Sequence, residues 1–269
     1  MIAVLGARGM LGHKMIERLN LRHHNVVGLS RDDFDATSAE SVWDAVTNLE
    51  PNVVINCVGI IKQRAQDPKE SIAINAALPH VLQDVCKFIG ADLIHFSTDC
   101  VFSGKAGKYT EDDPSDAEDL YGRTKYLGEI TAPNALTLRT SILGRETGNY
   151  KGLLEWFLRQ HGEINGFVNA IFTGVTTNWL SDTVADLITF NRPLHGLYQI
   201  AAPPVTKYDL LRMLKWVYQT DVQIKPVYEP FCDRSLNGDR FRQATGIITP
   251  PLDELLVTQE FQDRGHYAL

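Results

Sequence analysis

Met1-Ile-Ala-Val-Leu-Gly-Ala-Arg-Gly-Met-Leu-Gly12 is the stretch of sequence that decides the fold of this chain. Its first five residues are apolar and predict a short buried strand, and glycines follow at positions 6, 9 and 12. In a strand–turn–helix unit, Gly6 makes the turn, Gly9 lets the backbone approach a diphosphate, and Gly12 lets the helix pack closely on the strand. The amino terminus of that helix offers unpaired N–H groups to phosphates. The stretch therefore predicts a dinucleotide-binding loop.

Strand and helix patterns alternate behind this loop as far as Gly144, as parallel βαβ units require. The expected strands are Met1–Leu5, Asn25–Leu29, Val53–Cys57, Leu93–Ser97 and Leu136–Thr140. The expected helices are Gly9–Leu19, Ser38–Asn48, Pro68–Lys87 and Tyr121–Ala132. Right-handed crossovers place such helices on both faces of one sheet. The predicted fold class is α/β, a doubly wound parallel Rossmann sheet with a smaller mixed carboxy-terminal lobe.

The pattern is less regular after Gly144. Helices are expected over residues 152–161, 181–190 and 207–218, an extended segment over 175–179, and a late strand over 196–200. Six prolines from Pro203 to Pro251 predict irregular connections in the remainder. We therefore expect a cofactor-binding Rossmann domain over residues 1–150, to which 179–202 returns. The substrate-binding lobe is expected to comprise 151–178 and 203–269.

Charge and composition exclude several classes of function. The 269 residues carry a formal net charge of −7, which is unsuited to a nucleic-acid-binding surface. The apolar runs are too short to span a membrane, and the amino terminus does not resemble a secretory signal. Neither the eight histidines nor the four cysteines show metal-ligand spacing, so no protein-held metal is expected, and reduced thiols predict a cytoplasmic protein. The cysteines are Cys57, Cys86, Cys100 and Cys232.

The end of the second strand indicates which dinucleotide is bound. NAD-selective sites place an acid there for the ribose 2′-hydroxyl, whereas this chain has Ser30 followed by Arg31. Arg31 and Arg8 could hold the 2′-phosphate of NADPH through charge-assisted hydrogen bonds. The alternative is that both arginines are solvated on the surface. Asp32 and Asp33 follow at once, so NADPH is favoured and NADH is retained as a second candidate.

A second group of residues predicts carbonyl chemistry. Thr98 follows the fourth strand, at the sheet edge where open α/β sheets bind ligands. Tyr121 and Lys125 lie four residues apart on an expected helix, so both side chains lie on one face. We expect the ammonium to lower the pKa of the phenol and Thr98, or alternatively Ser97, to hydrogen-bond the reacting carbonyl oxygen. Alone, the Tyr–Lys spacing is more often that of a solvated helix face, and it indicates catalysis only together with the glycine loop and the Ser97-Thr98 pair at the strand end.

These motifs resemble the extended short-chain dehydrogenase/reductases, and within them the dTDP-4-dehydrorhamnose reductase family. The resemblance rests on the glycine loop, Ser97–Gly104, Tyr109–Asp113, Tyr121–Glu129, Arg139-Thr-Ser141 and Arg234-Ser-Leu. It implies that NADPH reduces the C4 keto group of a nucleotide-linked 6-deoxyhexose, with Tyr121 as proton donor, Lys125 on the nicotinamide ribose and Thr98 on the carbonyl. The implied cofactor-binding residues are Gly6, Arg8, Gly9, Met10, Leu11, Gly12, Ser30, Arg31, Cys57, Val58, Gly59, Tyr121 and Lys125. The implied substrate-binding residues are Asp99, Val101, Phe102, Ser141 and Arg234.

Several departures from the family pattern lie on the sugar side of the expected site. Cys100 stands where relatives have an aromatic residue, and the stretch Ile60-Ile-Lys-Gln-Arg64 is long and basic. The glycine loop also resembles that of GDP-fucose synthase, which epimerises its sugar with a Cys–His pair. We expect Cys100 to be a buried small residue, because His161 and His195 offer no dependable partner. Thr176, Thr177 and Asn178 are further candidates for the substrate lobe, and Arg234 could instead form a surface ion pair with Asp233 or Asp239.

Two other classes of function share this fold. One is an epimerase or dehydratase that keeps its NAD, and the other is a regulatory subunit that binds the cofactor without chemistry. The presence of Thr98, Tyr121 and Lys125 favours an enzyme over the regulatory subunit, and Arg31 weighs against tightly held NAD. A homodimer is expected from the fold, through helices such as the one that carries Tyr121.

Overall fold

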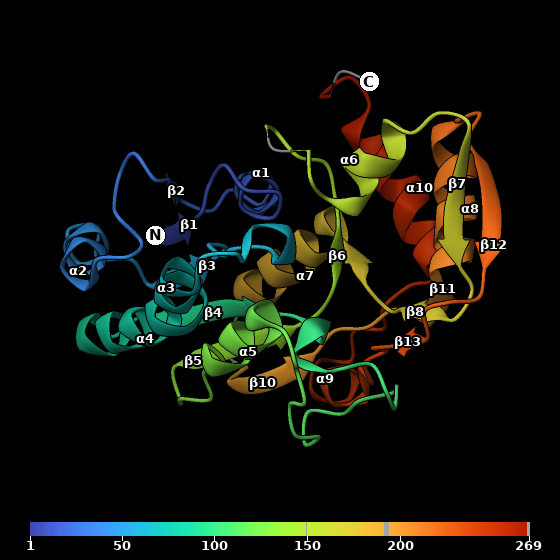
Figure 1. Ribbon diagram of the computed structural model, residues 1–269. Helices are drawn as coiled ribbons and strands as arrows, with labels where there is room; N and C mark the ends of the chain where they lie inside the picture. The colour runs from blue at the N-terminus through green and yellow to red at the C-terminus, as the bar shows by residue number, and fades with distance from the viewer. Residues whose placement is uncertain (149, 191–193, 268–269) are drawn as a thin grey trace.

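The computed structural model describes residues 1–148, 150–190 and 194–267, and a parallel sheet of six strands lies at its centre (Figure 1). The strand order is β2-β1-β3-β4-β5-β10. Their bounds are β1 Ile2–Leu5, β2 Val26–Leu29, β3 Val53–Asn56, β4 Asp92–Ser97, β5 Ala135–Arg139 and β10 Gly196–Gln199. The chain leaves β1 toward β2 on one side and returns to β3 on the other. This reversal opens a crevice at the carboxyl ends of β1 and β3, which is where such sheets bind ligands.

Helices cover both faces of the sheet. On one face α1 (Gly12–Leu21) packs against α7 (Thr177–Thr189), and Met15, Leu19 and Leu180 are fully buried between them and the sheet. The other face carries α2 (Ala39–Thr47), α4 (Leu78–Ile89) and α5 (Leu120–Leu127). The helix expected over residues 68–87 is present as α3 (Pro68–Ser71), a π-helical segment η2 (Ile72–Ala77) and α4. The doubly wound architecture is thereby confirmed.

The smaller lobe lies beside the carboxyl edge of the sheet (Figure 1). Its helices are α6 Leu153–Leu158, α8 Lys207–Tyr218 and α10 Leu252–Asp263. Its strands pair as β7 (Glu163–Phe167) with β12 (Gln223–Val227), and as β11 (Val205–Thr206) with β8 (Ala170–Phe172) and β13 (Cys232–Asp233). The short strands β6 (Ile142–Leu143) and β9 (Val175–Thr176) also pair. Buried Leu154, Phe157, Leu210 and Leu256 form the core of this lobe.

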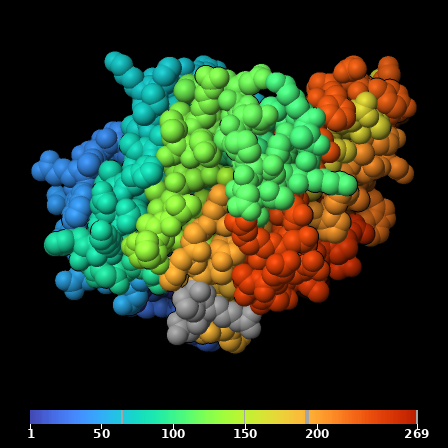
Figure 2. Space-filling view, turned by 90° about the horizontal axis from the view of Figure 1, so that it is seen from below, coloured from blue at the N-terminus to red at the C-terminus, as the bar shows by residue number. Residues whose placement is uncertain are grey.

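A long loop joins the two parts of the molecule. Residues 102–119 follow the 3-10 turn η3 (Asp99–Val101) and lie against the carboxy-terminal part of the chain. Figure 2 shows this green segment beside the orange and red residues. Tyr109 donates its N–H to the carbonyl of Ser235 at 2.8 Å and accepts from the N–H of Asn237 at 2.7 Å. The loop therefore brings Arg234 to the end of β4.

Two expectations for secondary structure were wrong. Residues 175–179 are not extended throughout, because the Thr176 hydroxyl caps the N–H of Trp179 and α7 starts at Thr177. Helix α5 ends at Leu127, where Gly128 approaches the backbone of η2 so closely that a Cβ would lie 2.0 Å from the carbonyl oxygen of Asn75. The proline-rich remainder also contains two helices that were not predicted, α10 and the short helix α9 (Asp239–Thr245), joined by irregular connections.

Candidate active site

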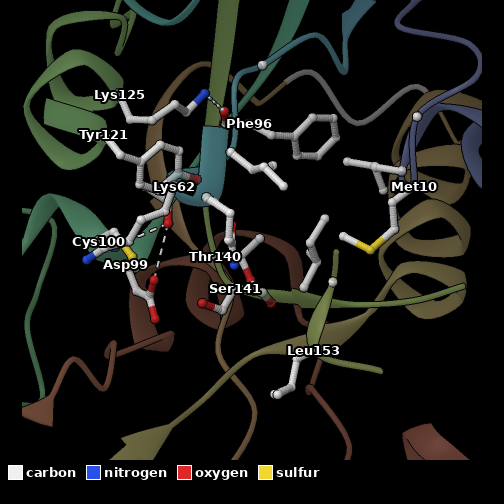
Figure 3. A pocket seen from close by; sticks show the side chains of 18 of the residues that line it. Met10, Lys62, Phe96, Asp99, Cys100, Tyr121, Lys125, Thr140, Ser141 and Leu153 are labelled. Carbon is white, nitrogen blue, oxygen red and sulfur yellow. Dashed lines mark hydrogen bonds between the residues drawn. The ribbon is translucent and has the colours of Figure 1, made fainter. Parts of the chain in front are cut away.

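A cavity of about 650 Å³ opens at the carboxyl edge of the sheet, between the Rossmann part and the smaller lobe. Tyr121 and Lys125 line one side of it, and Met10 of the glycine loop lies across from them (Figure 3). Most of the predicted site residues line this cavity: Arg8, Gly9, Met10, Leu11, Cys57, Val58, Gly59, Ile60, Thr98, Asp99, Tyr121, Lys125, Ser141 and Arg234. The chain thus brings residues from six separate regions of the sequence to one place.

Gly6 and Gly12 shape the glycine loop from behind its cavity-lining residues. Gly6 has φ +80°, and a Cβ there would lie 2.9 Å from the carbonyl carbon and oxygen of Cys57. A Cβ on Gly12 would lie 2.1 Å from the Gly6 carbonyl oxygen. Helix α1 begins after Leu11 without a side chain capping its first N–H groups. These N–H groups can therefore bind the diphosphate of a dinucleotide, and the backbone fits such a cofactor.

Of the two arginines expected at the cofactor's 2′-position, only Arg8 lines the cavity. Its guanidinium lies 2.5 Å from the carboxylate of Asp32, and both side chains are largely exposed. Arg31 is exposed outside the cavity lining. The Ser30 hydroxyl donates to the carboxylate of Asp33 at 2.9 Å. The structure therefore places Arg8 of the glycine loop at the cavity, with an acid already paired to it.

The start of α5 fixes the position of Tyr121. The carboxylate of Asp119 accepts from the N–H of Gly122 at 2.8 Å, which caps the helix. Gly122 allows the helix to approach the sheet edge, because a Cβ there would lie 2.1 Å from the carbonyl oxygen of Cys100. One turn later, Lys125 Nζ donates to the carbonyl of Phe96 at 2.7 Å (Figure 3). The predicted Tyr–Lys pair is thus held against the end of β4.

The structure distinguishes between the two candidate hydroxyls. The Ser97 hydroxyl donates to the carboxylate of Glu129 at 2.6 Å, and Glu129 forms a buried two-pronged pair with Arg139. Thr98 instead lies near enough to the Tyr121 side chain to lower the pKa of its phenol, against the effect of burial. Its hydroxyl also lies 3.2 Å from a carboxylate oxygen of Asp99. Of the two candidate hydroxyls, that of Thr98 is therefore the one that lies near the Tyr121 phenol.

The electrostatics of Tyr121 differ from the expectation. Burial raises the pKa of Tyr121, and the nearby Thr98 only partly opposes this. Burial also lowers the pKa of Lys125 to about 8, against the attraction of Glu129. The expected lowering of the phenol's pKa by the ammonium is therefore outweighed by desolvation. A phenol that stays protonated at neutral pH is in the form that donates a proton to a carbonyl.

Two predicted substrate contacts are wrong. The side chains of Val101 and Phe102 are fully buried and do not line the cavity, because the η3 turn directs them into a cluster with Tyr109 and Leu236. Phe102 stacks on Tyr109 with ring centroids 4.0 Å apart. The adjacent residues Asp99 and Cys100 line the cavity instead.

Arg234 lines the cavity beside Cys100. Its Nε donates to the carbonyl of Phe102 at 2.7 Å, and its Nη1 lies 3.7 Å from the sulfur of Cys100. The neighbouring thiols and carboxylates raise the pKa of Arg234 against the effect of its burial. The alternative ion pair of Arg234 with Asp239 is not formed, because Asp239 pairs with Arg242 instead. Arg234 is thus held with its charge facing the cavity.

Cys100 and the candidate histidines do not form an acid–base pair. Cys100 is only partly buried and lines the cavity, unlike the expected core residue. Burial and the nearby Asp99 raise the pKa of its thiol to about 12. His161 lies in an exposed turn, and His195 lies beside Asp92 at the opposite edge of the sheet.

The expected lobe residues Thr176, Thr177 and Asn178 do not reach the cavity. All three are buried, and Asn178 Nδ2 donates to side chains of α10, at 2.9 Å to Gln262 and 3.1 Å to Asp263. They hold α7 against α10, so their assignment to the substrate was wrong.

Sequence reasoning missed several residues that line the cavity. Lys62 reaches from the loop after β3, and its Nζ lies 2.6 Å from the carboxylate of Asp119. Lys207 and Cys232 line it from the smaller lobe. Glu146 lines it too, and its carboxylate accepts from the N–H of Gly152 at 2.9 Å. Only the basic stretch that contains Lys62 had a visible signal in the sequence.

Within the described part of the chain, no cluster of His, Cys, Asp and Glu side chains could hold a metal ion. The described helices also include none that is long and apolar enough to cross a lipid bilayer.

Comparisons with known proteins agree with this site. Residues 1–230 match the family described as the RmlD substrate binding domain. A dTDP-4-keto-6-deoxy-D-glucose reductase of Streptomyces niveus is 34% identical over 223 residues, which cover 78% of this chain and 76% of that protein. A dTDP-4-dehydrorhamnose reductase of Streptomyces griseus is 37% identical over 129 residues, but that match spans only 47% of this chain and 42% of the relative.

Solved structures show the same fold. The dTDP-4-dehydrorhamnose reductase of Bacillus anthracis, solved in complex with NADP, superposes with a TM-score of 0.88 at 21% identity and covers 97% of this chain and 98% of its own. The resemblance seen in the motifs is thus confirmed, and the chain belongs to the RmlD substrate binding domain family.

Proposed function

We propose that this chain is an NADPH-dependent oxidoreductase that reduces the 4-keto group of a nucleotide-linked 6-deoxyhexose, for the synthesis of deoxysugar precursors. The observation that carries this proposal is the convergence of Thr98, Tyr121 and Lys125 with the glycine loop in one cavity. The names of the relatives in Streptomyces niveus and Streptomyces griseus support the class of substrate. The NADP complex of the Bacillus anthracis protein supports the cofactor.

Tyr121, Thr98 and Lys125 each have a separate role in the proposed reduction. Bound NADPH supplies the hydride to the carbonyl carbon. Tyr121 gives its phenolic proton to the carbonyl oxygen, so that the keto group becomes a hydroxyl. Thr98 orients this oxygen through its contact with Tyr121. Lys125, held by the Phe96 carbonyl, stabilises the phenolate that remains and binds the nicotinamide ribose.

Positive side chains that line the cavity suit the diphosphate of a sugar nucleotide. Arg234 presents a fixed guanidinium, and Lys62 and Lys207 line the same cavity. Guanidinium and ammonium groups are the usual partners of phosphate oxygens. Asp99 and Ser141 line the same cavity, and we expect them to contact the sugar hydroxyls.

The proposal is tested by following the loss of NADPH absorbance with a panel of dTDP-linked, GDP-linked and UDP-linked 4-keto-6-deoxyhexoses. Turnover of one of them with formation of a C4 hydroxyl is the expected result. Cofactor binding without turnover of any keto sugar would support a regulatory subunit instead. Tightly bound NAD that survives purification and is regenerated in each cycle would support an epimerase or dehydratase.

We also propose a homodimer that acts in the cytoplasm. Apolar side chains on the outer face of the α4–α5 side are exposed: Ile72, Phe88, Tyr126 and Leu127 are between 45% and 73% exposed. Burying such a patch in a second copy is the usual way to cover it. Sedimentation equilibrium of the protein and of Leu127→Asp tests the dimer, because the charge is expected to dissociate it. Cell fractionation tests the location.

A further inference from the structure

The carboxy-terminal segment of the chain is anchored on the helix that follows the glycine loop. Lys14 of α1 is completely buried, and its ammonium lies 2.7 Å from the carboxylate of Asp263, the last residue of α10. Glu17 approaches the same ammonium at 2.9 Å. A buried charge pair of this kind fixes where residues 264–267 begin.

Tyr267 reaches the glycine loop through one histidine. The phenolic oxygen of Tyr267 lies 2.5 Å from Nε2 of His13, and Nδ1 of His13 lies 2.7 Å from the carbonyl oxygen of Gly9. Because a carbonyl oxygen only accepts, Nδ1 carries the hydrogen and Nε2 accepts from the Tyr267 hydroxyl. The two bonds form a relay from the end of the chain to the loop.

The relay fixes one peptide plane of the cofactor loop. The Gly9 carbonyl also accepts from the backbone N–H of His13 at 3.2 Å. A trans peptide is planar, so the N–H of Met10 points opposite to the Gly9 carbonyl. Gly9 and Met10 both line the cavity. Holding the carbonyl toward His13 therefore directs the Met10 N–H to the side where a diphosphate binds.

Tyr267 also contacts Arg145, which precedes the cavity-lining residue Glu146. The guanidinium of Arg145 lies 4.8 Å from the centre of the Tyr267 ring. Arg145 Nε donates to the carboxylate of Glu155 at 2.8 Å, and the same carboxylate accepts from the N–H of Glu146, which lines the cavity. The Tyr267 ring thus lies between the glycine loop and the loop that faces it.

We propose that His13 and Tyr267 are positioning residues for the cofactor diphosphate, and that their hydrogen bonds set the affinity of the glycine loop for both NADPH and NADH. This inference rests on the proposed function, since it assumes that a dinucleotide binds at the loop. The diphosphate is common to the two cofactors, so the relay acts on both alike. It does not touch the reacting groups, so it affects binding and not turnover.

The experiment measures the dissociation constants of NADPH and NADH by fluorescence titration, and kcat at saturating cofactor. Tyr267→Phe keeps the ring and removes the hydroxyl, and His13→Ala removes the relay. We expect each to weaken both cofactors by about three- to tenfold, the effect of losing one oriented hydrogen bond, with kcat changed less than about twofold. The double variant is expected to bind as His13→Ala alone does, because the two residues act in series.

Phe261→Ala is the matched control, because Phe261 is an aromatic residue of the same segment that is 71% exposed. Thermal melting checks that each variant is folded, and His13→Gln serves if His13→Ala is not. Unchanged dissociation constants, a loss confined to NADPH, or additive losses in the double variant would overturn the relay. Failure of the unsubstituted protein to bind either dinucleotide would overturn the proposed function, and the relay with it.

Discussion

The ammonium nitrogen of Lys125 lies 2.7 Å from the carbonyl oxygen of Phe96, and this hydrogen bond joins α5 to the carboxyl end of β4. Lys125 is 6% exposed, so its charge is held in a poorly solvated place. The contact keeps Tyr121, one helical turn away, beside Thr98. Lys125 therefore has two roles in the site, because it holds α5 against β4 and places a positive charge near Tyr121.

The buried lysine predicts how activity depends on pH. Burial lowers the pKa of Lys125 to about 8, so the ammonium is present below that pH and lost above it. We expect kcat/KM for the keto sugar to fall as pH rises through about 8. In Lys125→Arg the guanidinium stays charged, so activity is lower but the alkaline fall moves to higher pH. An identical alkaline limb in both proteins would contradict this assignment.

Tyr121→Phe removes the proton donor without changing the shape of the site. We expect NADPH affinity within a few-fold of the unsubstituted protein and turnover reduced by about 10²–10⁴, the usual contribution of a general acid. Tyr126→Phe on the same helix is the control, because Tyr126 is 45% exposed. Steady-state rates and NADPH titration give both quantities. Full turnover in Tyr121→Phe would remove Tyr121 from the mechanism.

The pair of Arg8 and Asp32 is expected to set the preference between cofactors. Arg8→Ala should weaken NADPH more than NADH, because only NADPH carries the 2′-phosphate. Asp32→Asn should strengthen NADPH and weaken NADH, since it removes a negative charge and a ribose acceptor. Arg31→Ala is the matched comparison, because Arg31 lies outside the cavity lining. A larger effect of Arg31→Ala on NADPH would transfer the role to that residue.

Arg234→Ala is expected to raise KM for the sugar nucleotide by about tenfold or more, as the loss of a charge-assisted contact to phosphate does. The dissociation constant of NADPH should not change. Arg242→Ala is the control, because Arg242 belongs to the same part of the chain and pairs with Asp239 at the surface. Initial rates over a range of substrate concentrations separate the two. An unchanged KM would exclude Arg234 from the substrate site.

The pair of Lys14 and Asp263 predicts a large effect on stability. Lys14→Met leaves a carboxylate buried without its cation, and breaking a buried pair in this way costs about 3–5 kcal/mol of unfolding free energy. Lys105→Met removes an ion pair whose side chains are both more than 70% exposed, and no measurable loss is expected. Urea unfolding of both variants makes the comparison. Equal stability of the two would show that the buried pair contributes nothing.

The sequence by itself determined the sheet, the glycine loop and the spacing of Tyr121 and Lys125. These features depend on periodicities of two and of three to four residues, which neighbouring positions in the chain carry directly. The turn at Gly6 is local in the same sense, because the absence of a side chain allows its positive φ.

Only the tertiary structure decided which of several equivalent residues face the site. Ser97 is engaged by Glu129, 32 residues later, so Thr98 accompanies the phenol. Val101 and Phe102 are buried because the η3 turn directs them into the core. Tyr267 meets His13 across 254 residues of sequence. Such contacts depend on how distant elements pack, and desolvation at these places sets the pKa values of Tyr121 and Lys125, which no local pattern of residues contains.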